Sequence, residues 1–551
     1  MKKLKITLNK KILNINKGEK IYKLLENNYI HDEIPITLAK LNNTYYELTD
    51  EIKEDGILEW VRTNNTLAMI AYARTLQFVF IKATLDIFNE ARINIEHSIN
   101  KGIFGEVYKL KALNKEDILL IKNRMQEIIK KNIVIEKLEF KKEDAIEIFK
   151  KYKMEDKVKL LQNVKVEKVK LYKIEDRYDY FYGDMAYSTG ILKYFDVIFY
   201  EPGFILSLPS HKNPTIIIPF VQQKQLANVF RETERWLNIL DVACVGALNE
   251  KLEGKDLTDI IRVSEALHEK KIAQIADMIK DKENIKVVLI AGPSSSGKTT
   301  FSKRLSIQLR VNGYMPISVS LDDYFINREN TPLDEEGKPD FESIYTLDLN
   351  LFNNHLNKLL LGEEVEIPVY NFKTGSREWH GNKLKLPYNG ILVIEGIHAL
   401  NPKLTEILKE ENKFKVYISA LTQLNLDNHN RIPTTDVRKV RRIVRDALSR
   451  GYNCEKTLEM WPSIKRGEEK NIFIYQEQAD IMFNSTLVYE FAILKKYCLN
   501  ELEKVNKDSI VYYEAKRLIK LLKFFKDLDI CRVPENSILR EFIGGSCFYN
   551  Y

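Results

Sequence analysis

Residues 289–305 have the sequence LIAGPSSSGKTTFSKRL, and most of what can be inferred about this chain starts from them. The stretch contains the pattern G-x-x-x-x-G-K-[ST], between apolar residues typical of a strand and a helical pattern. Glycines there let the backbone wrap closely around phosphate oxygens, and N–H groups at the helix start attract the anion. The residues predicted to hold nucleotide phosphates are Gly292, Pro293, Ser294, Ser295, Ser296, Gly297, Lys298, Thr299 and Thr300.

The sequence around this loop alternates between strand and helix patterns. Strands are expected at residues 285–290, 315–321, 390–396, 413–420 and 479–484, with helical segments between most of them. This alternation predicts an α/β fold with a parallel sheet and helices on both faces. Ligands of such sheets bind beyond the carboxyl ends of the strands.

Asp322 follows the second expected strand, in SLDDYF. Its carboxylate is therefore expected near the terminal phosphate, where it can take a proton from a hydroxyl group. The alternative interpretation of Asp322 is a helix cap or a turn residue.

Length and composition indicate an ordinary globular protein. The 551 residues are enough for about three or four domains. Eighty-five basic and 78 acidic residues leave a net charge of +7, which is weak support for nucleic-acid binding. Five widely separated cysteines argue against a disulfide framework and against a cysteine-based zinc site.

The N-terminus MKKLKITLNKK has no apolar core of a signal peptide. The most apolar long stretch, residues 66–85, is interrupted by Arg74, Gln77 and Lys82. A buried or amphipathic helix explains it better than a membrane span. We expect a cytoplasmic location and no membrane partner.

Several motifs between residues 285 and 490 occur together in one order and spacing. They are the phosphate loop, SLDDYF (320–325), DFESIYTLD (340–348), IPVYNFKTGSR (367–377), VIEGIHAL (393–400) and RRIVRDALSRG (441–451). With these motifs the region resembles the uridine kinase and phosphoribulokinase family of P-loop kinases. The resemblance implies an enzyme that uses ATP and Mg²⁺ and transfers the γ-phosphoryl group to the 5′-hydroxyl of a nucleoside similar to uridine or cytidine.

The resemblance also implies roles for single residues. Asp322 matches the catalytic aspartate, and Lys298 faces the β- and γ-phosphates. Thr299 and Glu395 match the residues that hold the metal. Three arginines match the phosphate- and substrate-facing positions of the family's lid helix: Arg442, Arg445 and Arg450. Such arginines would neutralise charge on the transferred phosphoryl group.

On the acceptor side the match is less complete. Phe341 and Glu342 match a Phe-Asp pair that contacts the nucleoside, with Glu one methylene longer than Asp. Tyr370 and Phe372 match aromatic positions around the base, and ordinary core aromatics are the alternative. Gly375 stands where family uridine kinases have a base-contacting histidine. The acceptor therefore stays open between a nucleoside, a sugar phosphate and another small alcohol. An RNA- or ribosome-associated P-loop regulatory protein is a third alternative.

The front of the chain diffusely resembles threonyl-tRNA synthetase. Residues 1–62, an α+β unit, resemble its ubiquitin-like TGS domain, and residues 63–225 resemble its editing-type domain. The histidines of the editing HxxxH motif fall at Arg74 and Phe78, and the later CxxxH pair falls near Phe181 and Met185. Because none of these can act as imidazole or thiol, we expect the editing chemistry to be lost. A structural or regulatory role is favoured over RNA contact, and homo-oligomerisation is left open.

The remaining boundaries follow from the same patterns. Residues 226–284 are expected to be a helical connector, and residues 285–500 the kinase-like domain. Residues 501–551 are expected to be a C-terminal helical segment, with a basic amphipathic helix at about 505–530 that ends before Pro534.

Overall fold

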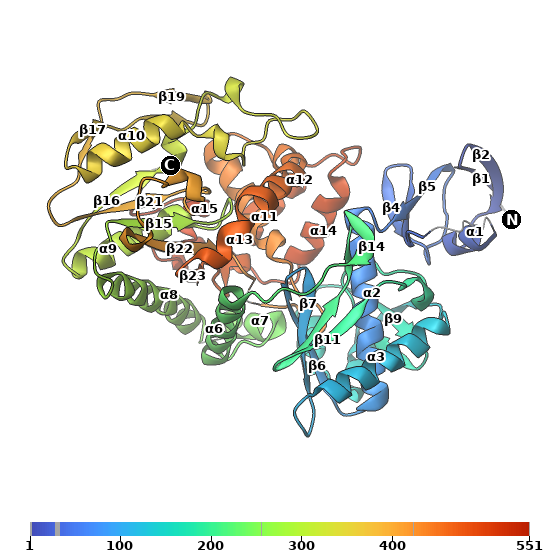
Figure 1. Cartoon of the computed structure of the whole chain (residues 1–551). Helices are drawn as coiled ribbons and strands as arrows, with labels where there is room; N and C mark the ends of the chain where they lie inside the picture. The colour runs from blue at the N-terminus through green and yellow to red at the C-terminus, as the bar shows by residue number, and fades with distance from the viewer. Residues whose placement is uncertain (1–2, 28–32, 255, 423, 550–551) are drawn as a thin grey trace. The chain divides into compact units, whose positions relative to one another are not determined.

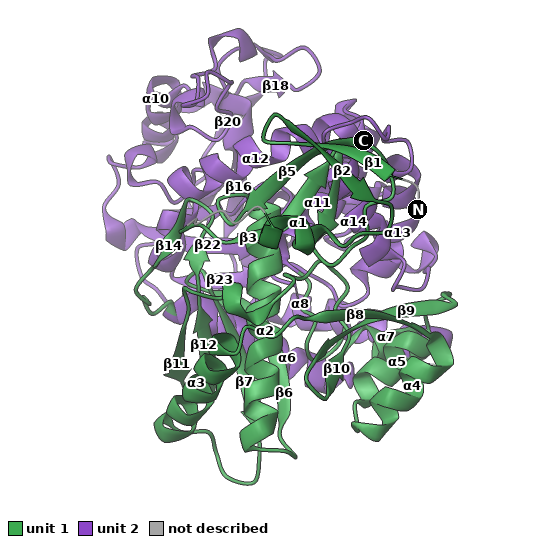
Figure 2. Cartoon of the chain, turned by 90° about the vertical axis from the view of Figure 1, so that its right-hand side faces the viewer, with its two compact units in different colours: residues 1–223, 243–250, 424–432 green, residues 224–242, 251–423, 433–551 purple. Residues whose placement is uncertain are grey.

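The computed structural model describes residues 3–27, 33–254, 256–422 and 424–549. The chain divides into two compact units, drawn in separate colours in Figure 2. Unit 1 comprises residues 1–223, 243–250 and 424–432, and unit 2 comprises residues 224–242, 251–423 and 433–551.

Unit 1 begins with a five-stranded sheet and one short helix. These elements are β1 (Lys3–Leu8), β2 (Lys11–Asn16), α1 (Ile21–Asn27), β3 (Ile36–Leu41), β4 (Thr44–Glu47) and β5 (Gly56–Arg62), with sheet order β2-β1-β5-β3-β4. An apolar core that includes Ile6, Leu24 and Trp60 lies within this part of the unit. The α+β composition agrees with the pattern of residues 1–62, and the resemblance to a TGS domain stays a prediction.

The rest of unit 1 is mixed. Its elements up to residue 217 are α2 (Thr66–Ile87), β6 (Arg92–Ile99), β7 (Gly102–Tyr108), α3 (Lys115–Lys130), β8 (Glu136–Lys141), α4 (Lys142–Lys151), α5 (Glu155–Gln162), β9 (Lys168–Ile174), β10 (Arg177–Asp179), β11 (Asp196–Tyr200), β12 (Gly203–Ser207), β13 (Pro209–Ser210) and β14 (Asn213–Ile217). Strands β6 and β7 belong to a four-stranded sheet with the order β11-β12-β7-β6, and β8 belongs to a three-stranded sheet with the order β10-β9-β8. Helix α2 is largely buried, which confirms the interpretation of residues 66–85.

The positions aligned with the editing motif lie inside unit 1. The rings of Phe78 and Phe181 are 5.3 Å apart, and Met185 belongs to the same apolar cluster. Arg74 donates from Nη1 to the carbonyl oxygen of Asp184 at 2.5 Å. Three of the four positions are therefore core residues. The resemblance to an editing domain stays a prediction.

Unit 2 is built on a five-stranded sheet with the order β16-β21-β15-β22-β23, in which every neighbouring pair is parallel. Its strands are β15 (Val287–Ala291), β16 (Met315–Ser320), β21 (Gly390–Glu395), β22 (Lys413–Ser419) and β23 (Ile481–Asn484). They correspond to the five strands expected from the sequence. Every residue of β15 is buried, as expected for the central strand of a sheet covered on both faces.

Helices and short hairpins surround this sheet (Figure 1). They are α6 (Lys224–Leu240), α8 (Leu257–Lys280), α9 (Lys298–Val311), α10 (Leu349–Leu360), β17 (Glu364–Glu366), β18 (Val369–Asn371), β19 (Ser376–Glu378), β20 (Lys383–Lys385), α11 (Thr434–Arg445), α12 (Cys454–Asn471), α13 (Glu490–Leu502), α14 (Tyr512–Leu522) and α15 (Arg540–Ile543). Helix α7 (Val245–Glu253) falls within the expected connector. The C-terminal helix is shorter than expected at both ends, because turns at residues 506–511 precede its start at Tyr512 and the helix ends at Leu522.

No helix in the part of the chain that the structure describes is both long enough and apolar enough to span a bilayer.

Candidate active site

Three strand ends bring the expected catalytic groups to one edge of the sheet in unit 2. Strand β15 leads into the phosphate loop, β21 ends at Glu395, and β16 leads into Asp322. Glu395 is paired in register with Ile290 of β15 and with Ser320 of β16. The parallel arrangement therefore places Glu395 between the loop and the segment that carries Asp322.

The phosphate loop has the local geometry that its motif requires. Gly297 has a φ of 86°, a left-handed conformation that favours glycine, and helix α9 starts at the next residue. The Lys298 ammonium donates to the carbonyl oxygen of Pro293 at 3.3 Å. This lysine therefore folds back over the loop, where a bound phosphate would meet it.

Glu395 accepts hydrogen bonds from the hydroxyl groups of Thr299, at 3.2 Å, and Ser320, at 3.1 Å. Burial and the nearby charge of Asp322 raise the pKa of Glu395 to about 7, with a smaller contribution from Glu541. A buried carboxylate beside a hydroxyl oxygen is a donor set that suits Mg²⁺, which takes few protein ligands and completes its shell with phosphates and water. No cluster of three or more His, Cys, Asp or Glu suited to a metal is found among the described residues. Thr299 and Glu395 would thus hold a metal only together with the nucleotide.

The two neighbouring aspartates differ in their surroundings. Asp323 accepts a hydrogen bond from the backbone N–H of Tyr370 at 3.2 Å, and burial raises its pKa to about 6. Asp322 lies in a short 3-10 helix and makes no side-chain cap to it. Asp322 is therefore not a helix cap, although it does lie in a turn, and its catalytic role stays a prediction.

Of the three arginines expected to face phosphates or substrate, only Arg442 bonds to the phosphate loop among the described residues. Arg442 donates to the hydroxyl of Ser294 at 2.8 Å, and Arg445 donates to Asp446 at 2.9 Å. Arg450 lies 4.2 Å from the centre of the Phe372 ring, and burial lowers its pKa to about 10 while Asp322 opposes the shift. Arg450 thus contacts one of the expected acceptor-side aromatics and lies within the electrostatic influence of Asp322.

The expected acceptor residues divide into two groups. Tyr370 and Phe372 pack edge-to-face at 5.2 Å, and both contact Phe325. Glu342 is buried, and burial together with Glu468 raises its pKa to about 8. Phe341, in contrast, is 45% exposed.

At Gly375 the backbone φ is +74°, and a Cβ atom there would lie 2.8 to 2.9 Å from the Arg328 side chain. Arg328 donates to the carbonyl oxygen of Phe372 at 2.5 Å and also bonds to Tyr370. The space beside Gly375 is therefore filled by a cation from a different segment.

Four further residues touch the phosphate loop and were not expected from the sequence. Arg438 donates to the carbonyl oxygen of Ser294, and Arg441 donates to that of Ser295. Glu468 accepts from the backbone N–H of Ser294, and Glu541 accepts from Thr300. The arginine spacing 438, 441, 445 along one helix face was a signal for the first pair. The two glutamates carry no such signal.

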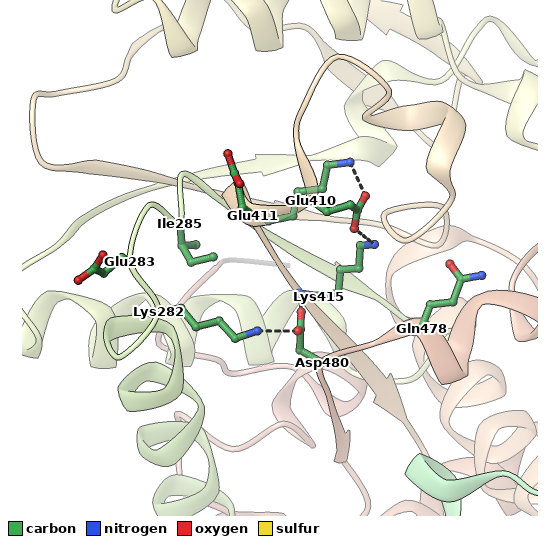
Figure 3. A pocket seen from close by; sticks show the side chains of 9 residues that line it. Lys282, Glu283, Ile285, Glu410, Glu411, Lys415, Gln478 and Asp480 are labelled. Atoms are coloured by element: carbon green, nitrogen blue, oxygen red, sulfur yellow. Dashed lines mark hydrogen bonds and ion pairs between the residues drawn. The ribbon is translucent and has the colours of Figure 1, made fainter.

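A pocket of about 430 Å³ lies elsewhere in unit 2 (Figure 3). Its lining includes the first residue of β22, Lys413, at the edge opposite the phosphate loop. Lys282 pairs with Asp480 at 2.7 Å, and Lys415 pairs with Glu410 at 2.5 Å (Figure 3). Because these charges satisfy one another, the pocket shows no feature of a nucleotide site.

Comparison with known proteins agrees with this geometry. Residues 287–490 match the model of the phosphoribulokinase/uridine kinase family. These residues form a domain of that family. A uridine kinase of Bacillus pumilus is 28% identical over 180 residues, which are 33% of this chain and 76% of the relative. A uridine kinase of Halobacterium salinarum is 26% identical over 194 residues, 35% of this chain and 77% of the relative.

Among solved structures, a possible uridine kinase from Bacillus stearothermophilus covers 39% of this chain and 98% of its own, at 18% identity and a TM-score of 0.28. A D-glycerate 3-kinase from Cryptococcus neoformans covers 46% of this chain and 86% of its own, at 15% identity and a TM-score of 0.23. The sequence match thus shows a P-loop kinase domain for a small molecule in unit 2. The matched residues lie outside the front of the chain.

Proposed function

We propose that this protein is an ATP- and Mg²⁺-dependent kinase that phosphorylates the 5′-hydroxyl of a nucleoside. The observation that carries the proposal is the meeting of the phosphate loop, Glu395 and Asp322 at adjacent ends of parallel strands. A protein that only binds nucleotide needs the loop, whereas a kinase also needs a carboxylate placed to receive the acceptor proton.

Each group has a role in this proposal. Asp322 orients the acceptor hydroxyl and takes its proton as the acceptor oxygen bonds to the γ-phosphorus, while the bond between that phosphorus and the bridging oxygen breaks and ADP leaves. Lys298, Arg442 and Arg445 neutralise the charge that develops on the transferred group. Thr299 and Glu395 would hold Mg²⁺, which supplies charge neutralisation on the phosphate oxygens when bound.

The aromatic pair formed by Tyr370 and Phe372 supports a planar acceptor. One observation favours a second candidate, a phosphorylated sugar or another anionic alcohol. Arg328 has no ion-pair partner in the part of the chain that the structure describes, although its guanidinium lies beside Gly375 and the aromatic pair. A phosphate or carboxylate on the acceptor would complement this charge.

A panel assay tests both candidates. The full chain is incubated with ATP and Mg²⁺ plus single nucleosides, sugar phosphates or hydroxy acids, and acceptor-dependent ADP is measured. ADP formation that depends on a nucleoside supports the nucleoside kinase. ADP formation with anionic alcohols alone would refute it and support the second candidate, a kinase for a phosphorylated sugar or another anionic alcohol.

The Asp322→Asn variant tests the assignment of the base. We expect turnover to fall at least about a hundredfold, because general-base catalysis contributes about that much or more, while nucleotide affinity is largely kept. Asp323→Asn is the matched control for the neighbouring carboxylate. Wild-type turnover by Asp322→Asn would refute the role of this residue.

A further inference from the structure

The C-terminal segment, residues 537–549, lies against the phosphate loop, although it is outside the residues that match the family model. Helix α15 is part of this segment (Figure 1). It includes Glu541. One carboxylate oxygen, Oε2, accepts from the backbone N–H of Thr300 at 3.1 Å and from its hydroxyl at 3.0 Å. Both donors of Thr300 thus point to one oxygen of Glu541.

Thr300 is the third residue of helix α9, and its N–H belongs to the first helical turn. The backbone hydrogen bonds of the helix begin with the bond from Phe301 N–H to the carbonyl oxygen of Gly297, at 3.1 Å. The N–H groups before it have no intrahelical acceptor, and such groups are the ones that bind anions at helix starts. The Glu541 carboxylate therefore accepts from the Thr300 N–H, a group of the kind that binds nucleotide phosphates.

The contact is closed to solvent. Thr300 is fully buried, and Glu541 is 6% exposed. The Tyr549 hydroxyl is 2.6 Å from the Thr300 hydroxyl oxygen, and Ile538 packs where a Cβ on Gly297 would lie. A phosphate oxygen reaches the Thr300 donors only after the Glu541 side chain has turned away.

The buried Glu541 carboxylate has few groups that compensate its charge. No lysine, arginine or histidine within ion-pair distance of Glu541 is found in residues 3–27, 33–254, 256–422 and 424–549. The hydrogen bonds from Thr300 are therefore its main compensation. A nucleotide triphosphate carries several negative charges and also attracts Lys298, so it can displace one carboxylate.

We propose that Glu541 is an autoinhibitory competitor of the nucleotide and that the C-terminal segment gates the phosphate loop. The inference rests on the proposed function, because it takes the loop as the nucleotide site. Release of Glu541 is then a step of nucleotide binding, and whatever draws this segment away raises the affinity for ATP.

The test measures the Kd of Mg²⁺-ATP for the full chain by titration calorimetry. Glu541→Ala removes the competitor and is expected to bind about tenfold more tightly. Glu541→Gln keeps an acceptor oxygen without the charge and is expected to fall between Ala and wild type. Glu535→Gln, an exposed carboxylate of the same part of the chain, is the control and is expected to match wild type.

Equal or weaker binding by Glu541→Ala than by wild type overturns the gate and leaves the kinase proposal standing. No ATP binding by either protein overturns both. If the Glu541→Ala variant does not fold, a second measurement on the wild type tests the proposal. It is the hydrogen–deuterium exchange of residues 537–549. Faster exchange after Mg²⁺-ATP is added supports release, and unchanged or slower exchange overturns it.

Discussion

At the residue scale, the site combines carboxyl groups whose environments differ strongly. The carboxylate of Asp322 makes no side-chain cap to its short 3-10 helix, and Glu395 is buried between two hydroxyl groups. Glu342 is buried with its Oε2 atom unsatisfied. A carboxyl in such surroundings favours its neutral form, because desolvation penalises the charge.

The raised pKa of Glu342 predicts a pH dependence of stability. Its folded pKa is about 8, against an ordinary value of 4.5, so the folded state holds a proton that the unfolded state releases between these values. The stabilising effect is complete below pH 4.5 and is lost as pH rises to about 8. Glu342→Gln should flatten this fall, measured as the thermal midpoint of unfolding between pH 5 and pH 8. Glu329→Gln, an exposed control, should keep the wild-type slope, and an unchanged slope in Glu342→Gln would contradict the prediction.

At the element scale, helix α11 is held more firmly than the sequence suggested for a mobile lid helix. Arg441 is fully buried, and its guanidinium donates to Glu490 at 2.7 Å and to the carbonyl oxygen of Ser485 at 2.9 Å. The regular helix ends at Arg445, and residues 446–450 form a π-helical turn that closes at Gly451, with a φ of 70°. The start of the expected lid is therefore fixed, and motion is expected only beyond Arg445.

Arg441→Met should lower the free energy of unfolding by about 3–5 kcal/mol, because it leaves the buried Glu490 charge unpaired. Denaturant unfolding followed by circular dichroism measures the loss. The double variant Arg441→Met/Glu490→Gln should recover part of it, since no buried charge is then left alone. A double variant no more stable than the single one would show that the ion pair is not the cause.

At the scale of the whole molecule, the two units are not consecutive in sequence. Residues 424–432 belong to unit 1, although the residues on both sides belong to unit 2. Within unit 1, Lys157 and Asp179 are fully buried and contact this segment: Lys157 pairs with Asp427 at 2.8 Å, and Asp179 pairs with His429 at 2.7 Å. Although burial alone would raise the pKa of Asp179, His429 and Lys157 hold it well below its usual range. The front of the chain thus supplies buried partners to a segment that directly precedes helix α11.

A fragment of residues 224–551 contains the complete kinase match but lacks Lys157 and Asp179. We expect it to aggregate or to unfold at a lower temperature than the full chain, because Asp427 and His429 lose their partners. Differential scanning calorimetry provides the comparison. The full-length variant Lys157→Met should show a related loss of about 3–5 kcal/mol. A fragment as stable as the full chain would mean that the front is dispensable for folding.

The sequence alone was enough for the phosphate loop, the five strands of the parallel sheet and the placement of Asp322 and Glu395 at its edge. These features depend on contiguous residues, since strand and helix periodicity and the glycine pattern are local. The missed hairpin of β6 and β7 shows the limit, because helix and strand patterns overlap in short apolar runs.

Only the folded chain showed which residues far apart in the sequence contact one another. Glu468 and Glu541 reach the loop from positions 174 and 241 residues away, and Lys157 meets Asp427 across 270 residues. Arg328 fills the space at Gly375 in the same way, from another segment. No local pattern encodes such contacts, because burial and charge pairing become defined only when separate segments pack together.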